Sequence, residues 1–556
     1  MNKFGRLAAI LTALCAAVVL LCYVSNLNSG PFEDDFGHVT MATVARDRGL
    51  SSVWTDAYDC FFFRPFNMGL LVLSLQAGSW TVAHGAALFI HVLLALAVGW
   101  LAARLFWGRL FPKQTSRGRE PRWLAVALGS AFFVHQGNTT SVLQLDTLSQ
   151  CTSDLFSVLA LLAAIVYCLP REGGLPRTER LPGAGDSPGA VGSSGEGEST
   201  VARQQTGWPV QSGRRARFAF APGVLASAGL GSLLAMAGKE GGVSTPVAVI
   251  ATVAFLAPRG FRLRKTAIVV ATQVLAGLAY VAWRLNVQNL IPAPSDVQDR
   301  YSFALSLDSV RNFIQFVFVE TVPWNSASLM WNRRPHEWAL GVALGLLVVV
   351  AAALGWRRLV REDRARRLLL AWLLCVFVIW CTPFVLLLKV SEQEVYRLAI
   401  PTVLILGLGC WAFLRSNVVR IALPVLVIWC AWVTVNTVAS VQKCDLLKHN
   451  ARVAEETLEA TSGALGDLSR TDEVWVYVVP RVEPWKRYSV VCVPEAALRA
   501  RAPLGLAWHV GRPGLKVEFV VPGREVPTYR GAPERLKKVR LDIESGQVEI
   551  VADASQ

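Results

Sequence analysis

The sequence predicts an all-α polytopic membrane protein with a small α+β domain at its carboxyl end. Of its 556 residues, 53% are hydrophobic and 17% are charged, whereas about a quarter of the residues of soluble proteins are charged. Several uninterrupted apolar runs have the length of roughly twenty residues that crosses a bilayer as a helix. After residue 440 these runs end, and short alternating or β-branched runs take their place.

Apolar segments alternate with basic loops and predict about eleven transmembrane helices. We expect them at residues 7–25, 81–105, 123–135, 153–169, 217–236, 243–258, 265–283, 338–356, 368–388, 398–414 and 419–440. About half of the 55 Lys and Arg residues fall in every second loop, and such basic loops stay in the cytoplasm. The amino terminus is therefore expected inside, with the first span retained as a signal anchor. The net charge of +15 reflects this asymmetry, so it gives no indication of nucleic-acid binding.

The parts outside the spans differ in composition. Residues 170–213 are rich in Gly, Ser, Pro and Glu, which predicts a disordered cytoplasmic loop. Amphipathic helices are expected at Thr43–Trp54 and Ser309–Val322 in outward loops. We expect a transmembrane domain over residues 1–440 and an extracytoplasmic α+β domain over residues 441–556, in a multi-pass protein of the bacterial inner membrane. In the α+β domain, a helix is predicted over residues 441–471. Strands are predicted after it at Val474–Val479, Tyr488–Val493, Leu515–Val521 and Val539–Val551.

The loop after the first span carries an unusual cluster of ionisable residues. It reads Pro-Phe-Glu-Asp-Asp-Phe-Gly-His over residues 31–38, which places three carboxylates and an imidazole beside an apolar run. Such groups are costly in lipid and have no use in packing. The alternative is a solvated turn, because Pro, Gly and Asp are ordinary loop residues. At a membrane surface the cluster could serve as a base, a metal site or a substrate clamp.

Ionisable residues collect on one side of the predicted membrane. The outward loops hold Asp34, Asp35, His38, Arg64, Asp146, Asp154, Lys239, Glu240, Glu392, Glu394 and Arg397. The span interiors hold hardly any besides His84 and His91, which lie two turns apart and are interpreted as interhelical hydrogen-bonding groups. A proton-coupled transporter would place carboxylates near the midplane. Carboxylates opposite basic groups suit a reaction in which a hydroxyl is deprotonated and a phosphate leaves.

The order of these motifs resembles the membrane part of C-fold (GT-C) glycosyltransferases. After the acidic pair come Arg64-Pro65-Phe66, His84-x6-His91, Phe132-Phe133-Val134-His135, Thr152-Ser153-Asp154-Leu155 and Met236-Ala237-Gly238-Lys239-Glu240-Gly241. The type most similar is the O-mannosyltransferase-like proteins, many of which carry tetratricopeptide repeats where this chain has the domain from residue 441. The resemblance covers residues 1–260 and weakens to Glu394-Val395-Tyr396-Arg397-x3-Pro401.

The resemblance implies a GT-C-like fold, a polyprenyl-phosphate sugar donor and transfer on the non-cytoplasmic face. It places an acidic residue of the first loop at the acceptor hydroxyl. Adjacent residues point in different directions, so only one of the pair can be the base; we predict Asp34 for this role and Asp35 for holding structure or a metal. Further candidates are Asp154, Asp146 and His38 on the acceptor side, Lys239, Glu240, Arg397 and Arg64 at the donor phosphate, and His135 and Glu394 elsewhere in the site.

Some positions depart from the family pattern. Ala87 stands where relatives often have Asn, Gln136 stands where they usually have Pro, and the later Arg-Tyr-x-Tyr-x-Pro pattern is rearranged around Tyr396. These departures leave the identity of the sugar open. The chain has no CxxC pair, so a zinc or thioredoxin site has no support. A divalent metal at the acidic pair and a metal-free reaction both stay open.

Two other functions compete with this interpretation. A lipid-linked glycan polymerase or ligase would depend on outward Arg333, Arg334 and His336 more than on Asp34. A non-catalytic membrane scaffold would use the outer domain to bind a partner in the cell envelope. In the favoured interpretation the partners are a polyprenyl-phosphate sugar, a hydroxyl acceptor on a lipid, glycan or protein, and the membrane lipid itself.

Overall fold

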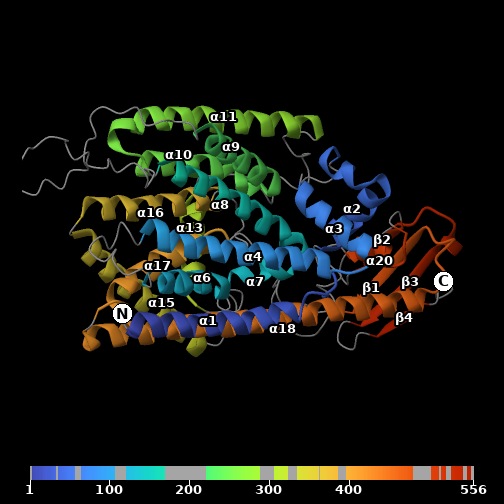
Figure 1. Ribbon diagram of the computed structural model, residues 1–556. Coiled ribbons are helices and arrows are strands. Elements are labelled where there is room, and N and C mark those ends of the chain that lie inside the picture. The colour runs from blue at the N-terminus through green and yellow to red at the C-terminus, as the bar shows by residue number, and fades with distance from the viewer. Residues whose placement is uncertain are drawn as a thin grey trace, which may run out of the picture.

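The protein is a long bundle of helices with a small sheet at one end (Figure 1). The computed structural model describes residues 3–32, 35–56, 64–106, 120–168, 221–287, 306–323, 335–361, 363–385, 396–416, 418–479, 502–512, 515–520, 528–542 and 547–551. The amino terminus lies at one end of the bundle and the sheet at the other (Figure 1). This arrangement agrees with the expectation that the two lie on opposite sides, whereas the orientation in a membrane stays a prediction.

The apolar helices form the body of the bundle. They are α1 (Lys3–Val24), α3 (Pro65–Ala77), α4 (Thr81–Leu101), α6 (Glu120–Val134), α8 (Leu148–Cys168), α9 (Ala221–Gly238), α10 (Thr245–Leu256), α11 (Arg262–Val287), α15 (Pro335–Arg361), α16 (Arg364–Val385), α17 (Ala399–Leu414) and α18 (Val419–Leu465). Shorter elements connect them: α2 (Asp35–Arg48), η1 (Leu50–Trp54), η2 (Ala102–Phe106), α7 (Asn138–Leu143), η4 (Leu145–Thr147), η5 (Glu240–Ser244), η6 (Arg259–Phe261) and α13 (Leu307–Thr321).

Each of the eleven expected spans corresponds to a helix in the described chain. Seven of these helices are long and apolar enough to cross a membrane, namely α1, α4, α8, α11, α15, α16 and α18. The spans expected for α6, α9, α10 and α17 are shorter apolar helices. The helix α3 was not expected as a span; it starts with Pro65 in its first turn and ends at Gly78, whose φ of 62° is left-handed.

Close packing of the helices depends on small residues. A Cβ atom on Gly99 of α4 would lie 2.7 Å from the carbonyl oxygen of Ala125, and one on Gly129 of α6 would lie 2.7 Å from that of Ala95. The backbones of α4 and α6 therefore touch directly. This kind of contact is usual for helices in membranes, where packing rather than water exclusion drives association.

The loop helices confirm one prediction and correct another. The helix α13 matches the amphipathic helix predicted at Ser309–Val322 and begins with a capping box at Ser306. The prediction at Thr43–Trp54 was wrong in its start, because α2 already begins at Asp35 and η1 follows as a separate turn. A carboxylate in the first turn of a helix is stabilised by the helix dipole, which favours this earlier start.

The carboxyl-terminal part combines a helix and a mixed sheet. The helix α18 continues without a break across residue 440 to Leu465 and covers most of the helix expected over 441–471. The sheet contains β1 (Glu473–Val479), β2 (Lys516–Val520), β3 (Leu536–Asp542) and β4 (Val548–Ile550) in the order β2-β1-β3-β4. The strand β1 is parallel to β2 and β3, while β3 and β4 are antiparallel.

This sheet confirms the strands predicted in three of the four expected regions. The fourth, Tyr488–Val493, and the loop over residues 170–213 lie outside the described residues. A short helix, α20 (Ala502–His509), precedes β2 and packs against it. The same helix also packs against α2 of the first loop. The sheet end of the chain is thereby brought next to the acidic segment.

Candidate functional site

A buried ion pair joins two segments that are far apart in the sequence. Arg397, directly before α17, donates from Nε to Oδ1 of Asp154 in α8, and both side chains are fully buried. Gln150 donates to the other carboxylate oxygen over 2.7 Å. From Nη2, Arg397 donates to the hydroxyl of Ser153 over 2.7 Å. The guanidinium also lies 5.8 Å from the ring centre of Trp380. Such a planar, multiply bonded contact fixes α8 against the start of α17.

The same arginine holds the turn between α9 and α10. Its Nη1 donates to the carbonyl oxygen of Gly241 over 2.6 Å and contacts the hydroxyl of Ser244 at 3.3 Å. The turn folds back on α9 so closely that a Cβ on Gly242 would lie 2.1 Å from the carbonyl oxygen of Ala235. Only glycine fits at that position. The turn therefore has one conformation, fixed by Arg397 on one side and by α9 on the other.

Lys239 lies at the start of this braced turn. Its backbone is extended, its N–H donates to the carbonyl of Ala235, and its side chain is 5% exposed. A Cβ on the preceding residue, Gly238, would lie 2.8 Å from the Cα of Ser153, so this turn packs on α8 next to Asp154. That this lysine lies at the membrane surface stays a prediction; within the protein its side chain is nearly buried, beside the first turns of α8.

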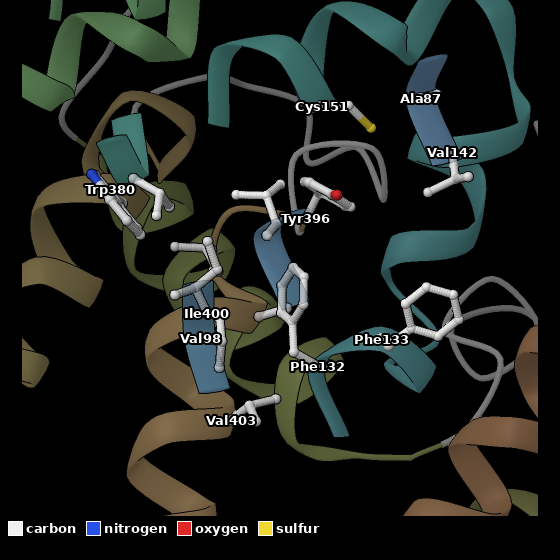
Figure 2. Packing of buried hydrophobic residues seen from close by; sticks show 14 of the residues in the cluster. Ala87, Val98, Phe132, Phe133, Val142, Cys151, Trp380, Tyr396, Ile400 and Val403 are labelled. Atoms are coloured by element: carbon white, nitrogen blue, oxygen red, sulfur yellow. The ribbon is translucent and has the colours of Figure 1, made fainter. Parts of the chain in front are cut away.

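Tyr396, the residue before Arg397, is held by a buried hydrogen bond. Tyr396 is fully buried, and its hydroxyl lies 2.8 Å from Nδ1 of His91. Since Nε2 of His91 lies 3.1 Å from the carbonyl oxygen of Phe133, that nitrogen carries the proton, and Nδ1 accepts from Tyr396. Figure 2 shows Tyr396 between Cys151 and Phe132. His84 likewise donates to the carbonyl of Ser29 over 3.2 Å, so both histidines are interhelical or helix–loop hydrogen-bonding groups, as predicted.

Part of the acidic segment forms the first turn of α2. Asp35 is the first residue of α2 and is fully buried; one of its carboxylate oxygens accepts from the N–H of Phe32 over 3.3 Å. His38, one turn further on, is also buried. Asp34, the predicted base, lies outside the described residues. The cluster predicted as a loop is thus ordered from Asp35 onward by a helix.

The helix α2 lies next to the start of α8. It packs against η4, the turn that contains Asp146 and leads directly into α8. The side chain of Asp146 is outside the described part of the structure. The elements α2, η4 and α8 and the turn with Lys239 are in contact one after another, so Asp35, the Asp154–Arg397 pair and Lys239 belong to one continuous region.

An aromatic cluster brings two further cations to this region. Phe66, two residues after Arg64, packs on Met236 and Ala237, which lie just before Lys239, and on Tyr280 of α11. Arg284, one turn beyond Tyr280, is 8% exposed and donates from Nη1 to the Tyr280 hydroxyl over 2.9 Å. Arg284 was not predicted as a site residue, because it stands where the apolar run of span seven ends and was assigned to the following loop.

Comparisons with known proteins give a likeness in architecture only. The sequence matches no known family profile and no curated protein. Over nearly its whole length, the chain is similar to ArnT from Cupriavidus metallidurans. With the apo structure of that protein it shares 14% sequence identity and a TM-score of 0.48, covering 95% of this chain and 92% of the other.

A second structure of ArnT, bound to undecaprenyl phosphate, gives 13% identity and a TM-score of 0.46, covering 96% of this chain and 89% of that one. At this identity, the roles of residues have to be argued from the side chains of this chain itself.

A second buried polar group is formed by other residues than the Asp154–Arg397 pair. It consists of His135 and Gln136 after α6, Glu320 in α13 and Lys443 in α18, and we refer to it as the Glu320 cluster. Lys443 is fully buried and donates to the side-chain and backbone oxygens of Gln136 over 2.6 and 3.1 Å. Nε2 of His135 donates to the carbonyl oxygen of Glu320 over 3.0 Å and lies 3.6 Å from its carboxylate.

The structure therefore distributes the predicted site residues over several places. Asp35, Asp154, Lys239 and Arg397 belong to the continuous region, and Arg64 stands at the start of α3 beside it. His135 belongs to the Glu320 cluster instead. Glu240 begins η5, but its side chain is not described, and Glu394 lies outside the described residues. Among the side chains that the structure describes, no three His, Cys, Asp or Glu gather closely enough to bind a metal ion.

Proposed function

We propose that this protein is a membrane glycosyltransferase of the GT-C type. It moves one sugar from a polyprenyl-phosphate donor to the hydroxyl of a lipid, glycan or protein. The observation that carries the proposal is the braced turn: a nearly buried lysine stands in a turn that packs on α8, and α8 follows directly on η4, the turn against which α2 with Asp35 packs. A fixed cation and a nearby carboxylate are what glycosyl transfer from a phosphate requires.

The donor phosphate is assigned to Lys239. The donor phosphate is negatively charged before and during the departure of the sugar, and a preorganised ammonium pairs with that charge in the bound donor and in the transition state alike, without having to move. Arg64 and Arg284 stand on the elements that meet Lys239 through the aromatic cluster, so they add positive potential on the same side. Arg397 was a candidate for this role; its three nitrogens donate to Asp154, Ser153, Gly241 and Ser244, and we now assign it to bracing the turn.

The acceptor base is assigned to Asp34. Its neighbour Asp35 already accepts a backbone hydrogen bond and is fully buried, which suits a residue that shapes the segment. In the reaction, the base takes the acceptor's hydroxyl proton while the acceptor oxygen forms a bond to the anomeric carbon. The bond from that carbon to the phosphate oxygen breaks, and polyprenyl phosphate leaves with the bonding electrons. Asp154 is paired to Arg397 and is assigned to the brace.

The acidic pair gives the first test. We expect Asp34→Asn to lower turnover by about two to four orders of magnitude, the usual share of a general base, because the amide keeps the shape and loses the basicity. Asp35→Asn should lower it less, since an amide oxygen can still accept from the N–H of Phe32. The measurement is transfer of labelled sugar from polyprenyl phosphate in membranes that carry each variant at matched expression.

A matched control is Asp47→Asn, in the same helix but exposed and paired with Arg46. It should keep wild-type transfer. Equal losses at Asp34 and Asp35 would indicate that the two carboxylates hold a divalent metal together. Wild-type transfer by both Asn variants would remove the acidic pair from the reaction. In the scaffold alternative, deletion of residues 441–556 changes the phenotype of the cell and neither substitution does.

A further inference from the structure

The short helix α20 of the carboxyl-terminal part is seated on the first residues of α2. Gly505 of α20 faces the ring of Phe36, because a Cβ at that glycine would lie 2.9 Å from the ring. One turn later, the Trp508 ring lies 6.4 Å from the Phe36 ring and 6.3 Å from that of Trp80. Phe36 is fully buried and directly follows Asp35. The contact thus reaches the residue next to the acidic pair.

The other side of α20 is tied to α18 and the sheet. The helix packs on both α18 and β2. Arg512, just after α20, donates to the carbonyl oxygens of Leu468 and of Thr471, the latter over 2.7 Å. Lys537 in β3 donates to the carbonyl oxygens of Leu465 and Asp467 at the end of α18. The end of α18, the sheet and α20 are therefore joined, and α20 is the element among them that packs on α2.

The helix α2 needs such external support. It has 14 residues, and an isolated helix of that length is marginal in water. Its other main contacts within the described residues are with α3, η1 and η4, which are themselves short connecting elements or a short helix. Its first turn carries Asp35 and Phe36, and the ring of Phe36 is enclosed by Gly505 and Trp508. Displacing α20 would therefore release the first turn of α2 before it released the remainder.

We propose that Trp508 and Gly505 are positioning residues, through which the carboxyl-terminal domain holds the acidic start of α2 in register with the Lys239 turn. This inference rests on the proposed function and gives the outer domain a role in the same reaction. Neither residue touches substrate. They act through Phe36. Its ring packs against the tilted ring of Trp508, and Gly505 admits its close approach, so these two contacts set the position of the helix.

The test uses the full-length protein and four substitutions. Trp508→Ala removes the ring, Trp508→Phe keeps an aromatic ring, and Gly505→Ala inserts a Cβ against Phe36. The control is Ile550→Ala on β4, a residue of the same sheet that is 67% exposed. For each variant, kcat and the KM for the lipid donor are measured, together with amide hydrogen exchange along α2 and the unfolding temperature.

We expect Trp508→Ala and Gly505→Ala to lower kcat about ten- to a hundredfold, as misplacement of reacting groups by an ångström does, with the donor KM within about twofold of wild type because Lys239 is untouched. Trp508→Phe should restore most of kcat. Amides of α2 should exchange faster in the two Ala variants, while Ile550→Ala matches wild type in every measurement. A purely structural role of Trp508 would lower the unfolding temperature without this division between kcat and KM and without rescue by Phe.

The proposal is overturned if Trp508→Ala leaves kcat or the exchange of α2 at the level of the Ile550 control, or if Phe fails to rescue. The failure of the proposed function is a different result. In that case the wild-type protein transfers no sugar, and the exchange data alone decide whether α20 holds α2.

Discussion

The Asp154–Arg397 pair and the Glu320 cluster are both buried in the helical bundle, but their charges are satisfied in different ways. In the first, an acid and a base touch directly, and every nitrogen of the guanidinium donates to a partner. In the second, Lys443 donates to an amide side chain and a carbonyl, and Glu320 faces the imidazole of His135. The first arrangement holds a turn that carries a cation of the proposed site. The second joins α6, α13 and α18 at a distance from that turn along the chain.

This difference indicates which of the two clusters needs a charged pair for its stability. A direct, desolvated ion pair becomes an uncompensated buried charge when one partner is removed, and such losses are large. A carboxyl group beside an imidazole and the Thr402 hydroxyl can instead remain protonated, and burial raises the pKa of Glu320 above its ordinary 4.5. The two regions should therefore respond differently to neutral substitutions.

The largest effect is expected from Arg397→Leu. The substitution leaves Asp154 buried without its cation and removes the hydrogen bonds to Ser153 and Gly241, which should cost roughly 3–5 kcal/mol of unfolding free energy. The double variant Asp154→Leu with Arg397→Leu should recover part of this loss, because two apolar groups can replace a buried pair. Unfolding is followed by tryptophan fluorescence in detergent.

The control for this pair is Arg452→Leu, where an exposed arginine faces Glu456 at 3.7 Å. A surface pair of this kind contributes little, so no measurable change is expected. If Arg397→Leu were no more destabilising than Arg452→Leu, the Asp154–Arg397 pair would not brace the turn.

A smaller effect, on binding rather than folding, is expected from Lys239→Ala. A charge at the lipid phosphate helps the ground state and the transition state alike, so its loss should raise the donor KM and leave kcat at saturating donor nearly unchanged. One charge-assisted contact contributes roughly 1.5–3 kcal/mol, or about ten- to a hundredfold in KM. Lys265→Ala, which removes a lysine bonded to the carbonyl of Tyr167, is the matched control. An unchanged donor KM would exclude Lys239 from the phosphate site.

The smallest effect is expected from Glu320→Gln, and it should depend on pH. Burial raises the pKa of Glu320 in the folded protein, so the folded state binds a proton that the unfolded chain releases above its ordinary pKa of 4.5. Wild-type stability contributed by this group is present below that pH and declines as pH rises towards the folded pKa. Glutamine does not titrate, so the unfolding temperature of the variant relative to wild type should increase from pH 5 to pH 8. A constant difference over this range would contradict a raised pKa.

Local patterns in the sequence predicted most of the fold. The spans followed from the length of apolar runs, and β1, β2 and the β3–β4 pair followed from alternating residues, because both depend on neighbours in the chain. The start of α2 was missed since Pro31 and Gly37 resemble a turn. The unbroken course of α18 was missed because its outer half is polar, so residue 440 marks a change in surroundings and not the end of a helix.

The site was predicted less completely, because its contacts join distant segments. Asp154 and Arg397 are 243 positions apart, and the sequence assigned them to opposite sides of the reaction instead of to each other. Glu320 and Lys443 were assigned to a loop helix and to the outer domain, since no local pattern reveals that both are buried. Arg284 belongs to the basic residues around Lys239 because Tyr280, to which it is bonded, packs against Met236 and Ala237. The sequence alone does not show this packing.

Because α18 is long, a small change in its tilt moves its far end by several ångströms. Its 47 residues span about 70 Å at a rise of about 1.5 Å per residue, and the segment beyond Ser440 accounts for about 38 Å. A tilt of about 5° at Ser440 would carry Leu465 sideways by about 3 Å, whereas a contact between rings weakens within about 1 Å of separation. A small change in the packing angle of one helix in the bundle would thus lift α20 from α2. The position of α20 at the first turn of α2 therefore depends on how the far end of the bundle is packed.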